Sequence, residues 1–289
     1  MAIHIQPTGA TPGAIVTGIR LAALGADEWR ALEQAFHAYG LLIFPDQHLD
    51  HDAQLAFARR FGDIEVLAEG MTTVPITNLD PQGQLLDQDS HRMQLLKGNE
   101  GWHTDSSYMP LAAKASVLSA HVLPLSGGDT EWADARAAYE ALDDATRARI
   151  ADLVACHDYF QSQARIGHRV EAGAGYGFFA GDKPLRPLVK VHPVTGRKAL
   201  YVGRHASSIV GMAQSEADAL IAYLNDHITH PSRVYIHRWQ VGDVAVWDNR
   251  CLLHRARPYD YRQTRVMMHT RIRGDARTER ALNAPEQAA

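Results

Sequence analysis

Hydrophobic residues recur along the chain with two periods, and each period predicts one kind of secondary structure. Spacing of three and four residues places side chains on one face of a helix. This spacing predicts helices over residues 26–39, 51–61, 134–142, 144–153 and 215–228. Short apolar or alternating runs predict two strands within 3–20 and others at 41–44, 74–78, 115–122, 130–132, 188–192, 198–202, 233–239, 243–247, 251–254 and 265–273. Strands therefore outnumber helices.

The order of these elements favours a mainly β fold with helical inserts. Short strands separated by Gly, Pro and Asp turns are typical of a jelly roll, here a cupin-like double-stranded β-helix. The chain has no internal repeat and no change in composition that marks a second domain. We therefore expect a single domain over residues 1–289.

Three segments lack a clear period. Residues 65–100 contain one strand and otherwise little regular pattern, and long irregular segments of this kind often form active-site lids. The alternative is a loop that is simply long. We expect the glycine-rich stretch 173–181 to be a flexible connection, and the polar, alanine-rich residues 275–289 to be a frayed tail.

Composition and charge limit the partners and the cellular location that we expect for the protein. The formal net charge is −4 and no block of Lys or Arg stands out, which argues against nucleic acid or a membrane surface as a partner. No apolar run approaches the roughly 20 residues that span a bilayer, and the N-terminus lacks the features of a signal peptide. Two cysteines are too few for a disulfide framework. We expect a soluble, cytoplasmic homo-oligomer.

His103 and Asp105 are the first candidates for chemistry. They lie two residues apart, so on an extended strand both side chains point to the same face. With a second imidazole they make the 2-His-1-carboxylate set that holds non-haem Fe(II) and leaves positions open. A surface histidine beside a turn aspartate has the same pattern, so the hypothesis needs a third ligand. His254, at the end of an apolar strand, is the candidate for it.

Arg265 opens an alternating strand eleven residues after His254. On this strand Arg265, Met267, His269 and Arg271 share one face. An arginine that faces the inside of a barrel is costly unless it meets an anion, and its guanidinium binds a carboxylate in bidentate fashion. The strand therefore predicts a carboxylate-binding site near the metal.

Several motifs of the chain, taken together, resemble one protein family. They follow each other in this order: His103-x-Asp105, Gly128-Asp129-Thr130, Trp247-Asp248-Asn249, His254-Arg255 and Arg265. In these motifs the chain is similar, over nearly its whole length, to the TauD/TfdA family of Fe(II)/2-oxoglutarate-dependent dioxygenases. The resemblance implies a double-stranded β-helix.

The resemblance also implies roles for single residues. His103, Asp105 and His254 would bind Fe(2+), Thr130 and Arg265 would hold the distal carboxylate of 2-oxoglutarate, and Trp247 would line that pocket. The reaction would use O₂, release succinate and CO₂, and hydroxylate a small anionic substrate, with ascorbate in support.

Four framework stretches resemble the aryloxyalkanoate dioxygenases in particular, of the (S)-phenoxypropionate type. They are residues 41–45, 185–193, 203–206 and 246–256. This implies hydroxylation next to an ether oxygen, which yields an unstable hemiacetal and then a phenol and a 2-oxo acid.

The residue that binds the substrate anion is left open by the sequence. Taurine-type relatives carry a second arginine four positions after the cofactor arginine, where this chain has His269. We expect Arg271 to lie outside the pocket, about 20 Å along the strand from Arg265 at ~3.3 Å per residue. The candidates for substrate binding are Lys97, Ser116, Arg204, His205 and His269. Each also fits an ordinary surface or strand position.

Two other functions remain as alternatives. The first is the same chemistry on a taurine-like sulfonate or a natural-product acid. The second is a non-oxidative metalloprotein, such as a Zn²⁺ hydrolase or a cupin-like binding module, because Zn²⁺ accepts the same ligands. Zinc gives no reason for the inward Arg265, so we expect a dioxygenase.

Overall fold

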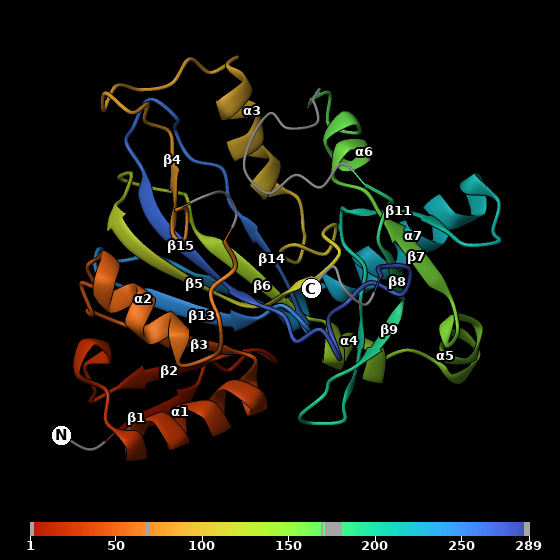
Figure 1. Cartoon of the computed structure of the whole chain (residues 1–289), viewed down its shortest axis with the longest axis horizontal. Helices are drawn as coiled ribbons and strands as arrows, with labels where there is room; N and C mark the ends of the chain where they lie inside the picture. Colours follow the sequence, from red (N-terminus) through yellow and green to blue (C-terminus); the bar gives the residue numbers. More distant parts are fainter. Residues whose placement is uncertain (1–2, 67–69, 169, 171–180, 286–289) are drawn as a thin grey trace.

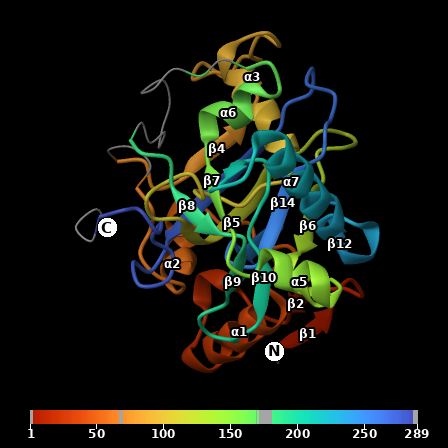
Figure 2. The same ribbon diagram turned by 90° about the vertical axis from the view of Figure 1, so that its right-hand side faces the viewer.

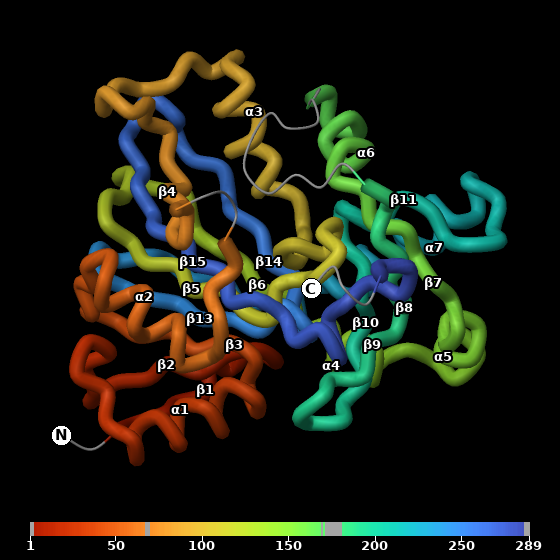
Figure 3. Tube along the Cα trace, viewed as in Figure 1, coloured from red at the N-terminus to blue at the C-terminus, as the bar shows by residue number. Residues whose placement is uncertain are grey.

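A seven-stranded sheet forms the centre of the computed structural model, which describes residues 3–66, 70–168, 170 and 181–285 (Figure 1). In spatial order its strands are β1 (His4–Pro7), β2 (Ala14–Thr17), β3 (Leu41–Phe44), β13 (Val244–Asp248), β5 (Ala113–Val122), β15 (Val266–Arg273) and β4 (Val74–Thr77). All neighbours are antiparallel except β2 and β3. Segments far apart in sequence therefore lie side by side, as the path of β15 between β5 and β4 shows (Figure 3).

Three smaller sheets complete the β structure. One has the order β12 (Val234–His237), β6 (Thr130–Asp134) and β14 (Leu252–Ala256). Another has the order β11 (Ala206–Ile209), β7 (Val154–His157) and β8 (Leu185–Pro187), and a hairpin pairs β9 (Val189–Val191) with β10 (Lys198–Leu200). Successive strands alternate between the seven-stranded sheet and the β12-β6-β14 sheet, in the steps β5 to β6 and β12 through β15.

The central strands of the large sheet, β3, β13 and β5, are buried on both faces, and the alternation of side chains along them assigns each residue to a face. On β3, Leu42 and Phe44 pack with the helices α1 (Ala26–Tyr39) and α2 (His51–Arg59). Leu41 and Ile43 point to the opposite face and share a core with the β12-β6-β14 sheet. This second face holds the candidate site.

The remaining helices lie mainly around the smaller sheets. They are α3 (His91–Lys97), α4 (Ala135–Glu140), α5 (Asp144–Ile150), α6 (Tyr159–Ala164) and α7 (Gln214–Ile228), with single 3₁₀ turns at Leu21–Ala23, Gly98–Glu100 and Pro231–Arg233. α3 and α6 lie at one end of the molecule, and α1 and β1 lie at the other (Figure 2). Among the described residues, no helix has the length and apolarity needed to cross a bilayer.

Most predicted elements are present with boundaries shifted by a few residues. The helix at 26–39 and the strand at 41–44 have the predicted bounds, because Gly40 at φ 74° ends α1 in the left-handed conformation. Helices α3 and α6 and strands β7, β8 and β11 were not predicted, because these short segments mix polar and apolar residues without a clear period. The expectation of an irregular segment over 65–100 is thus wrong for 91–97. The stretch 173–181 lies outside the described residues except for Gly181.

The predicted frayed tail is held against the body of the protein over residues 275–285. Glu279 is buried, and the Ala281 amide donates to the carbonyl of Pro110 at 2.8 Å. The Leu282 amide donates to the carbonyl of Leu185 at 2.9 Å. Hydrogen bonds to distant loops are invisible in local composition, and this is why the expectation fails for these residues.

Candidate active site

His103, Asp105 and His254 converge between the two facing sheets. His254 lies on β14, and His103 pairs with it as an isolated antiparallel bridge at the edge of that strand. The ligand atoms of the three side chains all lie within 4.8 Å of one another, and all three residues are buried. The structure thus brings together the three residues that the sequence predicts as a metal site.

The protonation of the two histidines suits metal binding. Burial lowers the pKa of His103 to about 4 and holds that of His254 well below its usual value, so both imidazoles are neutral at pH 7. The Nδ1 of His103 lies 2.8 Å from the carbonyl oxygen of Gly101, which leaves its Nε2 with a free lone pair. The buried Nδ1 of His254 has no hydrogen-bond partner in the described structure.

Asp105 is held ionised in this buried place. Burial by itself raises the pKa of the carboxyl, but its neighbours, Arg271 foremost, outweigh burial and hold the pKa well below the usual value. Arg271 Nη2 lies 3.4 Å from Asp105 Oδ1. A buried carboxylate beside two neutral imidazoles is a donor set that fits a divalent transition metal.

Arg271 is therefore nearer than the sequence predicts. We expected it to lie outside the pocket, but it lines the cavities on both sides of Asp105. The reason is that β15 crosses the site at its C-terminal end, where Arg271 pairs with Ser116 on β5. The number of residues along the strand gives the distance of Arg271 from Arg265, but it does not show that the cavities extend along the strand as far as Arg271.

A small cavity of about 60 Å³ contains the residues predicted to bind 2-oxoglutarate. Thr130, Trp247 and Arg265 line it together with His103, Asp105 and His254. Arg265 is buried, and burial lowers the pKa of its guanidinium. Its Nη2 donates to the Gly128 carbonyl at 3.0 Å and its Nε has no partner among the described residues. No carboxylate in the described chain forms an ion pair with it.

A larger cavity of about 470 Å³ opens on the other side of His103 and Asp105. Its wall from 71–99 combines the apolar side chains Met71, Val74, Pro75, Ile76, Leu95 and Leu96 with the polar Thr77, His91, Arg92 and Asn99, most of them on β4 and α3. The facing wall is aromatic and polar, with Tyr108, Tyr159, Gln163, Arg204 and His205. The segment 65–100, predicted as a lid, thus supplies one wall of this cavity.

Arg204 and His205, two of the candidates for substrate binding, line the large cavity. The guanidinium of Arg204 donates to the carbonyl oxygens of Gly98 and Ser162 and to the side-chain oxygen of Gln163. Burial lowers its pKa, and no carboxylate of the described chain pairs with it. His205 is buried, stacks on Tyr159 at 5.6 Å between ring centroids, and has its pKa held well below the usual value by burial.

The other three substrate-binding candidates are placed differently. Lys97 Nζ lies 3.2 Å from the Gln88 carbonyl oxygen and 5.4 Å from the Tyr261 ring centroid. Ser116 donates to Asp105 Oδ2 at 2.6 Å. His269 stacks on Trp247 with ring centroids 5.7 Å apart and lines the small cavity. Neither Lys97 nor Ser116 lines either cavity.

Several residues of the site were not singled out from the sequence. Tyr108 follows the metal pair by three residues and could have been noticed there. Tyr159 and Gln163 lie on the unpredicted helix α6, and Leu95 and Leu96 lie on the unpredicted α3. Only the packing of these helices over the sheet brings them to the cavity.

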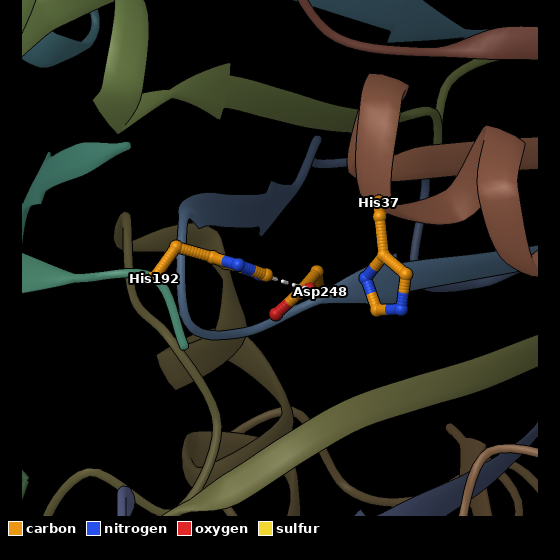
Figure 4. A group of neighbouring side chains, drawn as sticks. All are labelled: His37, His192 and Asp248. Atoms are coloured by element: carbon orange, nitrogen blue, oxygen red, sulfur yellow. Dashed lines mark hydrogen bonds and ion pairs between the residues drawn. The ribbon is translucent and has the colours of Figure 1, made fainter. Parts of the chain in front are cut away.

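A second group of two histidines and a carboxylate is formed by His37 on α1, by His192 and by Asp248, the last residue of β13 (Figure 4). Both oxygens of Asp248 are already engaged by Arg250, with Nε at 2.8 Å and Nη2 at 2.6 Å. His192 Nε2 lies 2.9 Å from Asp248, and its Nδ1 accepts backbone N–H bonds from Val194 and Thr195. A cation would have to displace the arginine, so this group is a hydrogen-bonded support rather than a second metal site.

Comparisons with known proteins agree with this geometry. The family model described as the taurine catabolism dioxygenase TauD, TfdA family matches residues 4–271. The chain is 48% identical to an (S)-phenoxypropionate/alpha-ketoglutarate-dioxygenase of Sphingobium herbicidovorans, over 97% of this chain and 98% of the relative. It is 37% identical to an alpha-ketoglutarate-dependent 2,4-dichlorophenoxyacetate dioxygenase of Cupriavidus pinatubonensis, over 88% and 91%.

A solved structure resembles the whole chain. The crystal structure of AAD-2 in complex with Mn(II) and N-oxalylglycine has a TM-score of 0.89 and 39% sequence identity to it. The match covers 98% of this chain and 100% of that one.

Proposed function

The chain belongs to the TauD/TfdA family of dioxygenases, and from this premise we propose that it hydroxylates small aryloxyalkanoate anions at the expense of 2-oxoglutarate. One observation carries the proposal. Two arginines without a carboxylate partner in the described chain, the buried Arg265 and the partly buried Arg204, lie in separate cavities that share His103 and Asp105. A cation largely shielded from water in this way calls for an anion from outside. The two cavities thus suit two carboxylates, one from each reactant.

His103, Asp105 and His254 would hold Fe(2+), which would supply the activation of O₂ and the oxidative decarboxylation of 2-oxoglutarate. The protein contributes neutral imidazoles and an ionised carboxylate, both set by burial and by nearby charges. Their shared burial excludes bulk water from the centre. Ascorbate would keep the iron reduced.

Arg265 and Thr130 would bind the distal carboxylate of 2-oxoglutarate. The free Nε of Arg265 offers a second donor beside Nη2, which suits bidentate contact with a carboxylate. Trp247 and His269 stack on each other and form a flat wall of the cavity.

Arg204 would bind the carboxylate of the substrate, because no carboxylate among the described residues forms an ion pair with it. Arg271 is a weaker candidate, since Asp105 and Glu65 already oppose its charge. His205, which burial keeps neutral, would line the larger cavity beside Arg204. The apolar side chains of β4 and α3 would then face the aryl ring, and the segment 65–100 would cover it.

Other features stay proposals of the same kind. The two facing sheets support a double-stranded β-helix, because successive strands alternate between them. The low cysteine content supports a cytoplasmic location, which fractionation tests. Light scattering tests the predicted homo-oligomer.

The deciding experiment is succinate release with Fe(II), ascorbate and 2-oxoglutarate. The substrates are phenoxyacetate, both enantiomers of a phenoxypropionate, and taurine as a sulfonate without a ring. We expect release with the ethers, together with equal amounts of phenol, and little with taurine. Strong turnover of taurine and none of the ethers would favour the sulfonate alternative. No turnover with any substrate would contradict the proposal.

A further inference from the structure

A relay of buried polar side chains surrounds the carboxylate of Asp105 and lies outside both cavities. Its members are Ser116 on β5 and Asn249, which directly follows β13. Both side chains are buried, with 0% and 1% of their surface exposed. Neither is needed to contact a reactant, so their polar groups require another explanation.

Ser116 fixes one oxygen of the carboxylate. Its hydroxyl donates to Asp105 Oδ2 at 2.6 Å, a short bond typical of a donor to an ionised acceptor. In the sheet Ser116 lies directly opposite Trp247 on one side and Arg271 on the other, so all three side chains face the site. A larger side chain at this position would collide with one of these neighbours.

Asn249 fixes the direction of that bond. Its amide nitrogen donates to Ser116 Oγ at 3.0 Å, so the hydroxyl hydrogen must point the other way, to Asp105. Its side-chain oxygen accepts from the backbone N–H of Asp105 at 3.2 Å and from Trp247 Nε1 at 3.0 Å. These donors leave only one orientation for the amide group. Asn249 therefore holds both the backbone and, through Ser116, the carboxylate of Asp105.

The hydrogen bonds around Asp248 hold Asn249 itself in place. Asp248, the preceding residue, is fixed by Arg250 and by His192, and Figure 4 shows its contact with His192. The backbone N–H of Asp248 also donates to the Gly40 carbonyl at 2.8 Å, and the backbone N–H of Asn249 donates to the Lys114 carbonyl at 3.0 Å. The turn after β13 is thus a rigid base for the relay.

We propose that Ser116 and Asn249 are positioning residues that orient the Asp105 carboxylate for the metal, Ser116 through Oδ2 and Asn249 through Ser116 and the Asp105 amide. The inference rests on the proposed function, because it assumes that Asp105 is a metal ligand. Outer groups that orient metal ligands typically change metal affinity about 10–100-fold when removed.

The experiment measures Mn(II) dissociation constants by electron paramagnetic resonance, without substrate. It compares the wild type with Ser116→Ala, Asn249→Ala and the control Ser119→Ala. Ser119 is a buried serine of the same strand, but its hydroxyl bonds to Gln54 and His121, away from the metal. The melting temperature of each metal-free variant is measured alongside.

We expect about tenfold weaker binding for Ser116→Ala, at least as much for Asn249→Ala, and a wild-type constant for Ser119→Ala. If Asn249→Ala does not fold, Ser116→Ala alone decides. Binding within twofold of the wild type in Ser116→Ala would overturn the inference, and so would equal weakening in Ser116→Ala and Ser119→Ala. If the wild type does not bind Mn(II), the proposed function fails instead.

Discussion

His103 and His254 form a directly hydrogen-bonded pair although 150 residues separate them in the sequence. The backbone N–H of His254 donates to the His103 carbonyl at 2.8 Å, and the reverse bond measures 3.0 Å. Residues opposite each other in an antiparallel pair project their side chains to the same side. Their ring centroids therefore lie only 4.2 Å apart. The backbone pairing alone brings the two imidazoles together.

This pairing predicts that metal stabilises the fold, because the ion joins two distant segments. With Mn(II) at about 100 times its dissociation constant, the free energy of unfolding rises by about 2.7 kcal/mol. Calorimetry should show a melting temperature raised by several degrees. His103→Ala and His254→Ala should each lose this gain, while His48→Ala, at a side chain 59% exposed, should keep it. A full gain in either site variant would contradict the metal assignment.

Arg265→Gln should raise the KM for 2-oxoglutarate at least about 100-fold. Removing one partner of a buried charge pair costs about 2–5 kcal/mol, and each 1.4 kcal/mol is a factor of ten. Initial rates of succinate release over a range of 2-oxoglutarate concentrations measure this effect. The control is Arg262→Gln in the same loop, where an exposed arginine pairs with Asp260. Similar KM values for both variants would remove Arg265 from the co-substrate site.

Arg204→Gln should raise the KM for a carboxylate substrate and leave that for 2-oxoglutarate within about twofold. The reason is that Arg204 lines only the larger cavity and lacks a carboxylate partner in the described chain. The methyl ester of the same substrate tests the charge, since its affinity should not depend on Arg204. An equal loss for acid and ester would mean that Arg204 acts through packing against α3 and α6 rather than as an anion clamp.

His157 should make stability depend on pH. Burial lowers its pKa to about 3, whereas an unfolded histidine titrates near 6.5. Between these values the unfolded state binds more protons, so the free energy of unfolding falls as the pH falls below 6.5. At pH 5.0 the loss from this residue is about 2 kcal/mol, at 1.36 kcal/mol per pH unit. Urea unfolding of metal-free protein measures the free energy of unfolding at pH 7.5 and 5.0, and the difference between the two should be smaller in His157→Phe than in the wild type. An equal difference in both proteins would show that His157 is not the source of the pH dependence.

Cys251 should resist alkylation in the folded protein. It is 2% exposed, so the alkylating reagent cannot reach its sulfur. Burial also raises the pKa of its thiol, so the reactive thiolate does not form at pH 8. Cys156 is partly exposed and serves as the internal comparison. After brief treatment with iodoacetamide, peptide mass spectrometry should find label on Cys156 only, and on both residues in urea. Label on native Cys251 would show that the core around β14 opens readily.

Elements with a long or regular hydrophobic pattern were predicted from the sequence more accurately than short, mixed ones. Long periodic segments such as Ala26–Tyr39 and strongly apolar runs such as Leu41–Phe44 were predicted with their bounds. The six-residue helix at Tyr159–Ala164 was not, because so few residues give little periodic signal. It forms on its sheet through tertiary packing, and with it come two residues of the large cavity.

By itself the sequence determined the chemical types of the site: two histidines, an aspartate, and an inward arginine eleven residues after the second histidine. Residue spacing alone could not determine which His-x-Asp pair meets a second histidine. His48-Leu49-Asp50 has the same spacing as His103-Thr104-Asp105, yet His48 is exposed and pairs with Asp46. Only the pairing of His103 with His254 selects the second motif, because a third ligand comes from a distant strand.

The tertiary structure also decided which groups Ser116 and Arg271 contact. Both belong to strands whose inward faces the sequence can indicate, but the sequence does not say what lies opposite. Sheet register places Ser116 between Trp247 and Arg271 and turns its hydroxyl to Asp105. Register is fixed by packing across strands remote in the chain, and for that reason the sequence proposes three metal ligands but does not indicate which side chains contact them.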